Sequence, residues 1–313
     1  MRPSRRPCAS GGRGLRCASV SRSPCPPWRV PAFRARRPAG PTRMPSCTGS
    51  RLCFPRPIAE CMVNLPPKPV SEVWRPHLTR LPERHGRRRA VRRILRWAAR
   101  LVVGLAFEVT VHGLEHYPRQ GPALLVANHL GDADAVVGLA FFPVLPEVFA
   151  KAELVDLFPW GQLMEAYGVI WVHRGRPDRR ALRAGLQALA EGRLLAIAPE
   201  GRQSVTGALE PGTEGVAYLA LKADVPVVPI ALTGTRNAQV YGALKRLRRP
   251  RVTLTVGAPF RLQPPAHLSW RQALTWGTER IMCALARLLP PEYRGVYASC
   301  VESAPASGEP HGA

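Results

Sequence analysis

Three polar segments of the chain carry residue types whose spacing suits proton transfer and anion binding. In the first segment, Asn128 and His129 directly follow an apolar run, and Asp134 stands five positions after the histidine. An imidazole titrates near neutral pH and can take the proton of an attacking hydroxyl, while a carboxylate on its other nitrogen fixes the tautomer. The spacing therefore predicts a general base, His129, oriented by Asp134. Asp132 competes for the orienting role, and Asn128 is expected to hold the loop and to border the substrate.

The same segment has two other interpretations. It is compatible with a helix N-cap region whose aspartates only bond free backbone amides. It also offers three candidate metal ligands, His129, Asp132 and Asp134. The His-x-His-x-Asp-His pattern of metallo-hydrolases is missing, however, because position 131 is glycine and position 133 is alanine. We therefore expect no metal.

The second polar segment ends at Arg174, just past an apolar run at 169–172. An arginine in this position can bind a phosphate through two parallel hydrogen bonds, and Gly175 permits a close backbone approach. An ordinary surface arginine is the alternative interpretation. The neighbouring His173 alternates with the apolar residues of the run, so we expect it to be structural.

The third polar segment, Glu200-Gly201-Arg202, follows an apolar run at 194–198. It places a hydrogen-bond acceptor, a flexible turn and a cation within three residues. This combination suits a polyol phosphate, with Glu200 accepting from a hydroxyl and Arg202 neutralising the phosphate. A polar turn without a function is the alternative interpretation.

The elements that would position these segments alternate along the chain. Strands are expected at 107–111, 123–127, 147–150, 169–172, 194–198, 225–232 and 251–256, and helices at 134–142, 153–166, 177–191, 212–222 and 269–289. This alternation predicts an α/β fold with a mostly parallel sheet flanked by helices. In such sheets, binding sites collect in the loops that lead from strands into helices, which is where the three polar segments lie.

A basic amphipathic helix is predicted ahead of the sheet, where eight arginines and no acid lie between Arg84 and Arg100. Helical spacing puts Arg89, Arg92, Arg93, Arg96 and Arg100 on one side and Val91, Ile94, Leu95, Ala98, Leu101, Val102 and Leu105 on the other. With Trp97 near the boundary, such a helix suits an anionic membrane interface. A core-packing helix with a solvated arginine face is the alternative. The apolar stretch 101–107 is too short to cross a bilayer.

Charge and cysteine are concentrated near the N-terminus. The 313 residues carry a formal net charge of +24, and residues 1–61, with 13 arginines and a single acid, supply half of it. Because Pro and Gly interrupt every window there, we predict a basic extension without a core. It is a targeting peptide, an arm that touches nucleic acid or membrane, or sequence upstream of a start at Met62 or Met44. Of the eight cysteines, six lie in this stretch, and Cys283 and Cys300 are expected to be reduced thiols.

Composition sets the remaining boundaries. A 46% share of apolar residues supports a sizeable core, and the absence of any apolar run of eighteen residues argues against a polytopic membrane protein. We divide the chain into the extension 1–61, a basic amphipathic helical region at 62–106, one folded domain at 107–298 and a flexible tail at 299–313.

The three segments, in this order and each after a predicted strand, resemble the glycerolipid acyltransferase family. The matching residues are Asn128, His129 and Asp134 in the first block, Gly168 and Arg174 in the second, Pro199, Glu200, Gly201 and Ser204 in the third, and the two-proline strand 225–230 in a fourth. The stretch 150–154 also resembles the family's Lys-x-Glu-Leu. Two positions depart from the pattern. Gly131 stands where the family usually has Ser, and Arg202-Gln203 replaces Thr-Arg.

The resemblance implies a membrane-associated O-acyltransferase of phospholipid biosynthesis, with 107–298 as its acyltransferase domain. It implies lysophosphatidate or a similar lysolipid as acceptor and acyl-CoA or acyl-carrier protein as donor, with no bound cofactor and no covalent acyl-enzyme. It makes His129 and Asp134 the catalytic pair and assigns Asn128, Arg174, Glu200, Gly201 and Arg202 to substrate binding. We expect a peripheral or interfacial protein on the cytoplasmic face of an anionic membrane. Nucleic acid is the weaker partner, because no known binding motif accompanies the charge.

Two alternatives remain open at the level of the sequence. One is a catalytically impaired basic protein that binds membrane or nucleic acid through an acyltransferase-like domain, which the charge of +24 and the altered third block favour. The other is an acyltransferase with a different lipid acceptor. An assay with acyl-CoA and lysophosphatidate separates an enzyme from a binding protein.

Overall fold

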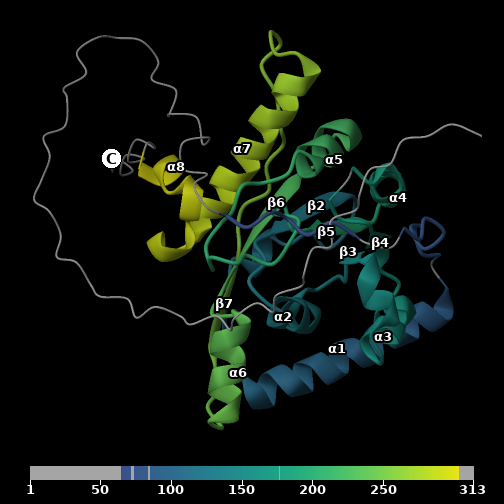
Figure 1. Ribbon diagram of the computed structural model, residues 1–313, viewed down its shortest axis with the longest axis vertical. Coiled ribbons are helices and arrows are strands. Elements are labelled where there is room, and N and C mark those ends of the chain that lie inside the picture. Colours follow the sequence, from purple (N-terminus) through teal and green to yellow (C-terminus); the bar gives the residue numbers. More distant parts are fainter. Residues whose placement is uncertain (1–64, 72–73, 84, 176, 303–313) are drawn as a thin grey trace, which may run out of the picture. The chain divides into compact units, whose positions relative to one another are not determined.

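The computed structural model describes residues 65–71, 74–83, 85–175 and 177–302 (Figure 1). The predicted extension 1–61 and most of the predicted tail 299–313 lie outside these residues. Within the described part, one seven-stranded sheet has the order β1-β7-β6-β2-β5-β3-β4. Its strands are β1 (Glu108–His112), β2 (Ala123–Ala127), β3 (Glu147–Lys151), β4 (Ile170–Val172), β5 (Leu194–Ile197), β6 (Val227–Thr233) and β7 (Arg251–Val256). Only the β6–β7 pair is antiparallel, so the predicted, mostly parallel sheet is confirmed.

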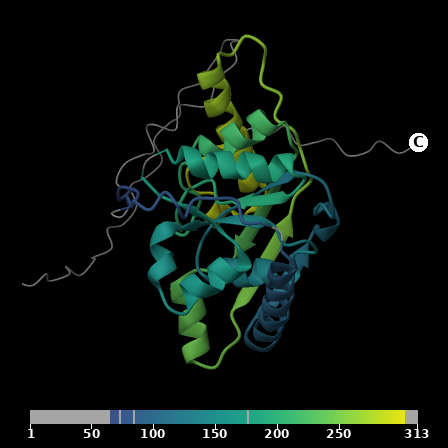
Figure 2. The same cartoon turned by 90° about the vertical axis from the view of Figure 1, so that its right-hand side faces the viewer.

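Helices cover both faces of this sheet (Figure 2). They are α1 (Gly86–Ala106), α2 (Ala133–Phe141), α3 (Trp160–Tyr167), α4 (Arg179–Ala190), α5 (Gly215–Ala223), α6 (Asn237–Lys245), α7 (Trp270–Leu288) and α8 (Ser299–Glu302), with short 3₁₀ turns η2 (Leu114–His116), η3 (Ala152–Asp156), η4 (Pro291–Tyr293) and η5 (Gly295–Tyr297). The central strand β2 shows why there are two layers. Its alternate side chains Leu124 and Val126 join the core formed with α4, α5 and α7, while Ala123 and Leu125 join the core formed with α1 and α2.

Local signals fix where several of these helices begin. The Asp178 carboxylate accepts from the backbone N–H groups of Arg180 and Ala181 at the start of α4. Ser269 and Gln272 form a capping box at the start of α7. Because these caps follow strand-to-helix loops, they also fix the direction in which those loops leave the sheet.

The orientation of α1 differs from that of a core-packing helix with a solvated arginine face, while contact with a membrane stays a prediction. Its arginines Arg92, Arg96 and Arg100 turn toward the domain, where they donate to Glu147 and to the carbonyls of Phe142 and Ala140. Its outward side carries exposed apolar residues: Ile94, Trp97, Leu101, Val102 and Leu105. The arginine side chains are long enough to reach carbonyl oxygens left without partners around the end of α2, which is why this face turns inward. No described helix is both long and apolar enough to span a membrane.

Three local predictions are corrected. The helix expected at 153–166 is divided into η3 and α3, because Pro159 between them has no N–H to donate. The helix α6 was not expected at all. Cys283 and Cys300, expected as reduced thiols, form a disulfide between α7 and α8. Their 17-residue separation gives no indication in the sequence that the two helices lie together.

Candidate active site

The first polar segment is the loop between β2 and α2, and Asn128 anchors it. This residue is 2% exposed. Its amide donates to the Leu232 carbonyl at 2.8 Å and accepts from the Leu232 N–H at 2.7 Å, which ties the loop to the neighbouring strand β6. Both ends of the amide are therefore used inside the protein, and Asn128 positions the next residue, His129.

His129 and Asp134 form a close pair in this loop. The ring Nδ1 lies 2.7 Å from Asp134 Oδ2, and the same oxygen accepts from the N–H groups of Leu130 and Gly131. The Asp134 side chain is 8% exposed and that of His129 is 26% exposed. Since the carboxylate occupies Nδ1, the ring presents Nε2 as the nitrogen that can take a proton.

The competing acid, Asp132, is engaged elsewhere. Its carboxylate accepts from Gln203 Nε2 at 2.8 Å and from the Tyr241 hydroxyl at 2.9 Å, and its backbone N–H donates to Asn237. Geometry thus pairs Asp134, not Asp132, with the imidazole. Tyr241 and Asn237 belong to α6, which the sequence did not predict, so this polar network beside His129 had no signal in the sequence.

Glu200 holds the backbone of the loop that carries His129. Its side chain is fully buried, and its carboxyl accepts from the N–H of His129 at 3.3 Å and from the N–H of Glu210 at 3.1 Å. Burial raises the pKa of Glu200 to about 8, so the group is mainly protonated at neutral pH. The structure places this carboxyl beneath the loop instead of on an open surface, where it can accept from a substrate hydroxyl only after rearrangement.

Arg202 also turns inward. Its Nε donates to Glu210 Oε2 at 2.8 Å, and its Nη1 donates to the carbonyls of Pro66 and Pro67. Both charged side chains are nearly buried, at 7% and 1% exposure. Glu210 is a partner that the sequence analysis missed, because nothing in an eight-residue spacing across a loop indicates an ion pair. Gly201, between Glu200 and Arg202, has a φ of +72°, a conformation that favours glycine.

Arg174 follows β4 and keeps its guanidinium free of hydrogen bonds to any residue that the structure describes. Its backbone is fixed by Ser71, whose hydroxyl accepts from the Arg174 N–H at 2.8 Å and whose N–H donates to the Arg174 carbonyl at 2.9 Å. Burial lowers the pKa of Arg174, partly offset by Glu153. Arg174 is half buried, and its guanidinium N–H groups are available to a ligand.

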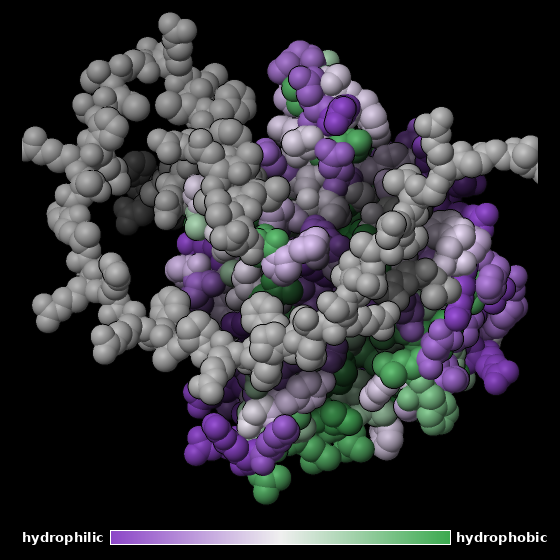
Figure 3. Space-filling model, in the orientation of Figure 1, coloured by the Kyte–Doolittle hydropathy of each residue, from purple (hydrophilic) through white to green (hydrophobic). Residues whose placement is uncertain are grey.

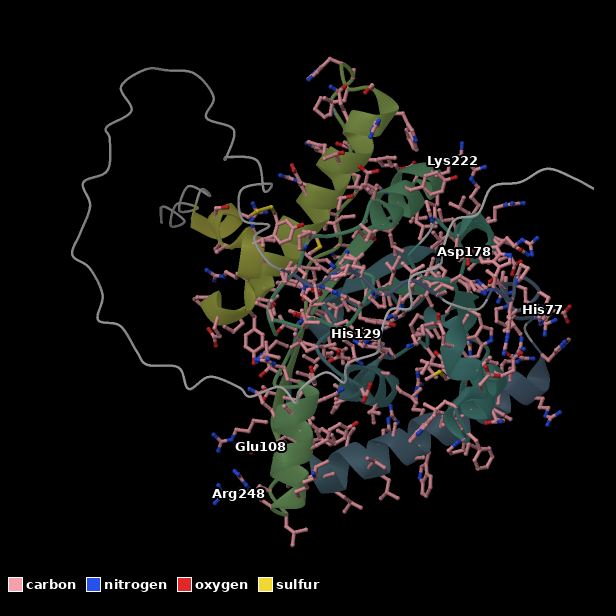
Figure 4. The ribbon with its side chains drawn as sticks, in the orientation of Figure 1. His77, Glu108, His129, Asp178, Lys222 and Arg248 are labelled. Carbon is pink, nitrogen blue, oxygen red and sulfur yellow. A yellow bond between two sulfur atoms is a disulfide. The ribbon has the colours of Figure 1, made fainter. Side chains whose placement is uncertain are left out.

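The order of strands sets the order of these groups. β2 and β5 are neighbours, so His129 and Glu200 touch, whereas β4 lies three strands from β2, roughly 14 Å at the usual strand spacing. All four strands from β2 to β4 are parallel, and their polar loops therefore leave the same edge of the sheet. Figure 4 shows His129 at this edge and Asp178 apart from it, beside α4.

A second pair with the same spacing, His173 and Asp178, is closed off. The two side chains are each 2% exposed and lie 3.1 Å apart, and His173 Nε2 accepts from the Arg75 N–H. Both ring nitrogens are used, which agrees with the structural role expected for His173. Among the described residues, no group of three or more His, Cys, Asp and Glu side chains is arranged to hold a metal ion.

Comparisons with known proteins find related acyltransferases. Residues 108–233 match the family described as acyltransferase. A lyso-ornithine lipid O-acyltransferase of Pseudomonas aeruginosa is 36% identical over 142 residues, which cover 45% of this chain and 53% of that protein. The 1-acyl-sn-glycerol-3-phosphate acyltransferase beta of Homo sapiens is 35% identical over 133 residues, covering 41% and 46%.

A third relative, a 1-acyl-sn-glycerol-3-phosphate acyltransferase of Chlamydomonas reinhardtii, is 30% identical over 206 residues and covers 64% of this chain and 57% of that protein. The chain thus spans about half the length of the curated relatives it matches. Among solved structures, the 1-acyl-sn-glycerophosphate acyltransferase PlsC of Thermotoga maritima is similar, with 24% identity and a TM-score of 0.48, over 64% of this chain and 81% of that one.

Proposed function

The chain belongs to the glycerolipid acyltransferase family, and on that premise we propose that it transfers an acyl chain from a thioester to the hydroxyl of a lysolipid. One observation carries the proposal: the His129 ring, held by Asp134 at 2.7 Å, remains partly open to solvent at the end of a central strand. An imidazole in that position is suited to deprotonate an alcohol. We propose acyl-CoA or acyl-carrier protein as the donor.

In this mechanism His129 Nε2 takes the proton of the acceptor hydroxyl while the hydroxyl oxygen attacks the thioester carbonyl. The C–O bond forms, the C–S bond breaks, and the imidazolium returns the proton to the departing thiolate. Asp134 keeps Nδ1 protonated and stabilises the transient imidazolium. No acyl-enzyme is formed, so the chain needs no nucleophilic serine.

The other site residues act around this pair. Asn128, Glu200 and Arg202 keep the loops in place, and Gly201 allows the turn between the last two. Arg174 is the group that can contact the acceptor head group, since its guanidinium has unspent donors and guanidinium binds phosphate or carboxylate in a planar, bidentate manner.

Lysophosphatidate is the first acceptor to test. A second candidate, a lyso-ornithine lipid, is favoured by one observation at the site: beside His129, where the family pattern has Arg, this chain has Gln203 bonded to the Asp132 carboxylate. An acid and an amide there suit a head group that carries an amine. One relative, at 36% identity, is named for that lipid.

We also propose that the enzyme works at the cytoplasmic face of an anionic membrane. The support is an apolar surface on the outward side of α1, seen along the lower edge of Figure 3. The turn before α3 adds exposed Leu157 and Phe158, and α3 itself adds exposed Trp160 and Leu163. The exposed arginines of α1, Arg87, Arg89 and Arg93, would meet lipid phosphates.

Purified protein with labelled acyl-CoA and a panel of lysolipids tests this function. The panel contains lysophosphatidate, a lyso-ornithine lipid and a neutral monoacylglycerol, and His129→Ala protein is the matched control. Transfer to a lysolipid that is absent with the variant supports the proposal. Near-normal turnover by the folded variant would refute the mechanism, and tight, salt-sensitive vesicle binding without turnover would favour a binding protein instead.

A further inference from the structure

Residues 65–71, Leu-Pro-Pro-Lys-Pro-Val-Ser, form an extended segment that we call the strap. It contacts both the second and the third polar loop, although it precedes residues 108–233, which match the acyltransferase family. At one end the carbonyls of Pro66 and Pro67 accept from Arg202 Nη1 at 2.9 and 3.3 Å. At the other end Ser71 exchanges two hydrogen bonds with the backbone of Arg174. In Figure 1 the strap is the darkest blue trace, which crosses the view in front of the strands.

The strap is seated firmly on these loops. Three of its seven residues are prolines, which fix the backbone in an extended form with little entropy left to lose. Val70 packs so closely on Gly175 that a Cβ at that glycine would lie 2.6 Å from Val70 atoms. The strap therefore packs on this edge of the sheet, where it would border a bound ligand.

Apart from Arg174 at one end of the strap, the charges near the strap leave one cation without an ion-pair partner among the described residues. Arg202 and Glu210 neutralise each other, and Glu200, with its pKa raised to about 8 by burial, is mainly uncharged at neutral pH. The remaining group is Lys68, at the middle of the strap. Its Nζ donates to the neutral Pro211 carbonyl at 3.1 Å and to no carboxylate among the described residues. Two of its three N–H donors are thus free to meet a ligand.

We propose that the strap is the outer wall of the acceptor site and that Lys68, in place of the inward-turned Arg202, binds the anionic group of the acceptor head group. The inference rests on the proposed function. Lys68 lies close enough to Arg202, Glu200 and Glu210 to interact electrostatically with all three, and Glu200 holds the backbone of His129. An anion on Lys68 is thereby placed on the same side of the sheet as the reacting imidazole. Arg174, at the far end of the strap, offers the second cation.

Kinetics of three variants test this role. Lys68→Met keeps the aliphatic stem and removes the charge, Lys68→Arg keeps the charge, and Lys222→Met on the exposed surface of α5 is the matched control (Figure 4). With lysophosphatidate we expect Lys68→Met to raise the acceptor KM about 10- to 100-fold, the usual effect of losing a hydrogen bond between charged groups. The acyl-CoA KM should stay constant, kcat should change much less, Lys68→Arg should recover most of the loss and Lys222→Met should behave as wild type.

Two kinetic outcomes would overturn the inference. One is an unchanged acceptor KM in Lys68→Met protein. The other is a rise in the acyl-CoA KM alone, which would assign Lys68 to the phosphates of the donor. Thermal unfolding of each variant shows whether a loss comes from misfolding, and rescue by Lys68→Arg identifies the charge as its cause.

A second measurement keeps the inference separate from the proposed function. The chain has four lysines, Lys68, Lys151, Lys222 and Lys245, so limited acetylation of the full chain followed by mass spectrometry resolves each one. Lysophosphatidate should slow the acetylation of Lys68 and leave Lys222 unaffected, and monoacylglycerol should protect neither. Protection without any turnover would sink the proposed function and support the anion site. Equal acetylation of Lys68 with and without lysophosphatidate would overturn the site even in an active enzyme.

Discussion

His129 and His173 each stand five positions before an aspartate, and each ring lies within hydrogen-bond distance of that aspartate, at 2.7 and 3.1 Å. The two differ in what surrounds the other nitrogen. His173 Nε2 accepts a backbone N–H inside the core, whereas the His129 side chain is 26% exposed. Proton exchange with a substrate requires a free nitrogen and a path to it, so only His129 is suited to act as a base.

The two aspartates of the first segment can be separated by matched substitutions. Asp134→Asn should lower kcat about a thousand-fold or more, because an amide at that position no longer holds the correct tautomer or stabilises the imidazolium. Asp132→Asn should change kcat by a few-fold at most, since its carboxylate contacts Gln203 and Tyr241 and not the ring. Initial rates with saturating substrates measure both. Equal losses, with both proteins folded, would contradict the assignment of the orienting role to Asp134.

Glu200 gives a prediction about stability and pH. Its pKa is raised from 4.5 to about 8 in the folded protein, so folding retains a proton that the unfolded chain releases. The stabilisation from this group is therefore fully present below about pH 4.5 and is lost as the pH rises toward 8. Glu200→Gln is neutral at every pH and lacks this dependence. Urea unfolding of both proteins between about pH 5 and 8 should show the wild type losing stability relative to the variant. A difference in unfolding free energy between the two proteins that does not change with pH would show that Glu200 carries no such proton in the folded state.

Residue types and spacing are enough to predict the His129–Asp134 pair but not to orient the third segment. The His129–Asp134 pair lies within one loop, so its five-residue spacing carries the geometry. Arg202 instead finds its partners at Glu210 and, more than 130 residues away, at the Pro66 and Pro67 carbonyls. A local pattern contains no information about such distant partners, and the arginine was expected to face a substrate for that reason.

At the scale of elements, α1 shows a similar limit. Helical periodicity correctly separates an arginine side from an apolar side, but it does not tell which side faces the domain. Here buried Glu147 and the carbonyls of Phe142 and Ala140 near the end of α2 accept hydrogen bonds from the arginines and turn that side inward. The strands were easier to predict, since buried parallel strands are short apolar runs between turn signals. The missed helix α6 is a nine-residue segment of weak periodicity, a length at which periodicity alone decides little.

The outward face of α1 supplies a prediction about membrane binding. Replacing Trp97, Leu101 and Leu105 by Ser should weaken binding to anionic vesicles at least ~10-fold, because each removes apolar surface worth about 1–2 kcal/mol when buried. Stability should change little, as all three side chains are about half exposed or more. Trp270→Ser is the matched control, since Trp270 is 51% exposed and begins α7, at the end of that helix which lies far from α1 in Figures 1 and 2. Vesicle sedimentation measures binding. Equal effects of the control and the triple variant would rule out α1 as the contact.

For the molecule as a whole, topology and charge act over different distances. The parallel order of β2, β5, β3 and β4 brings His129 and Glu200, 71 residues apart, to one edge of the sheet, and the strap lies across the loops of that edge. Contacts of this kind act over a few ångströms and belong to residues 65–302. The net charge, in contrast, acts over a Debye length of about 10 Å and is shared equally between residues 1–61 and the rest of the chain.

The short-range contacts of the site and the long-range net charge give different predictions for a chain that begins at Met62. Acyl transfer in detergent micelles should be retained within about two-fold, because every described contact of the site, including the strap, lies beyond that residue. Binding to anionic vesicles should weaken at low salt, since half of the net charge is removed, and the difference from the full chain should fade toward about 1 M salt as the Debye length shrinks to about 3 Å. Micelle kinetics and a salt series of vesicle sedimentation measure the two effects independently. Loss of turnover in micelles would show that the first 61 residues contribute directly to the site, and a difference in vesicle binding that persists at high salt would show that they contribute more than charge.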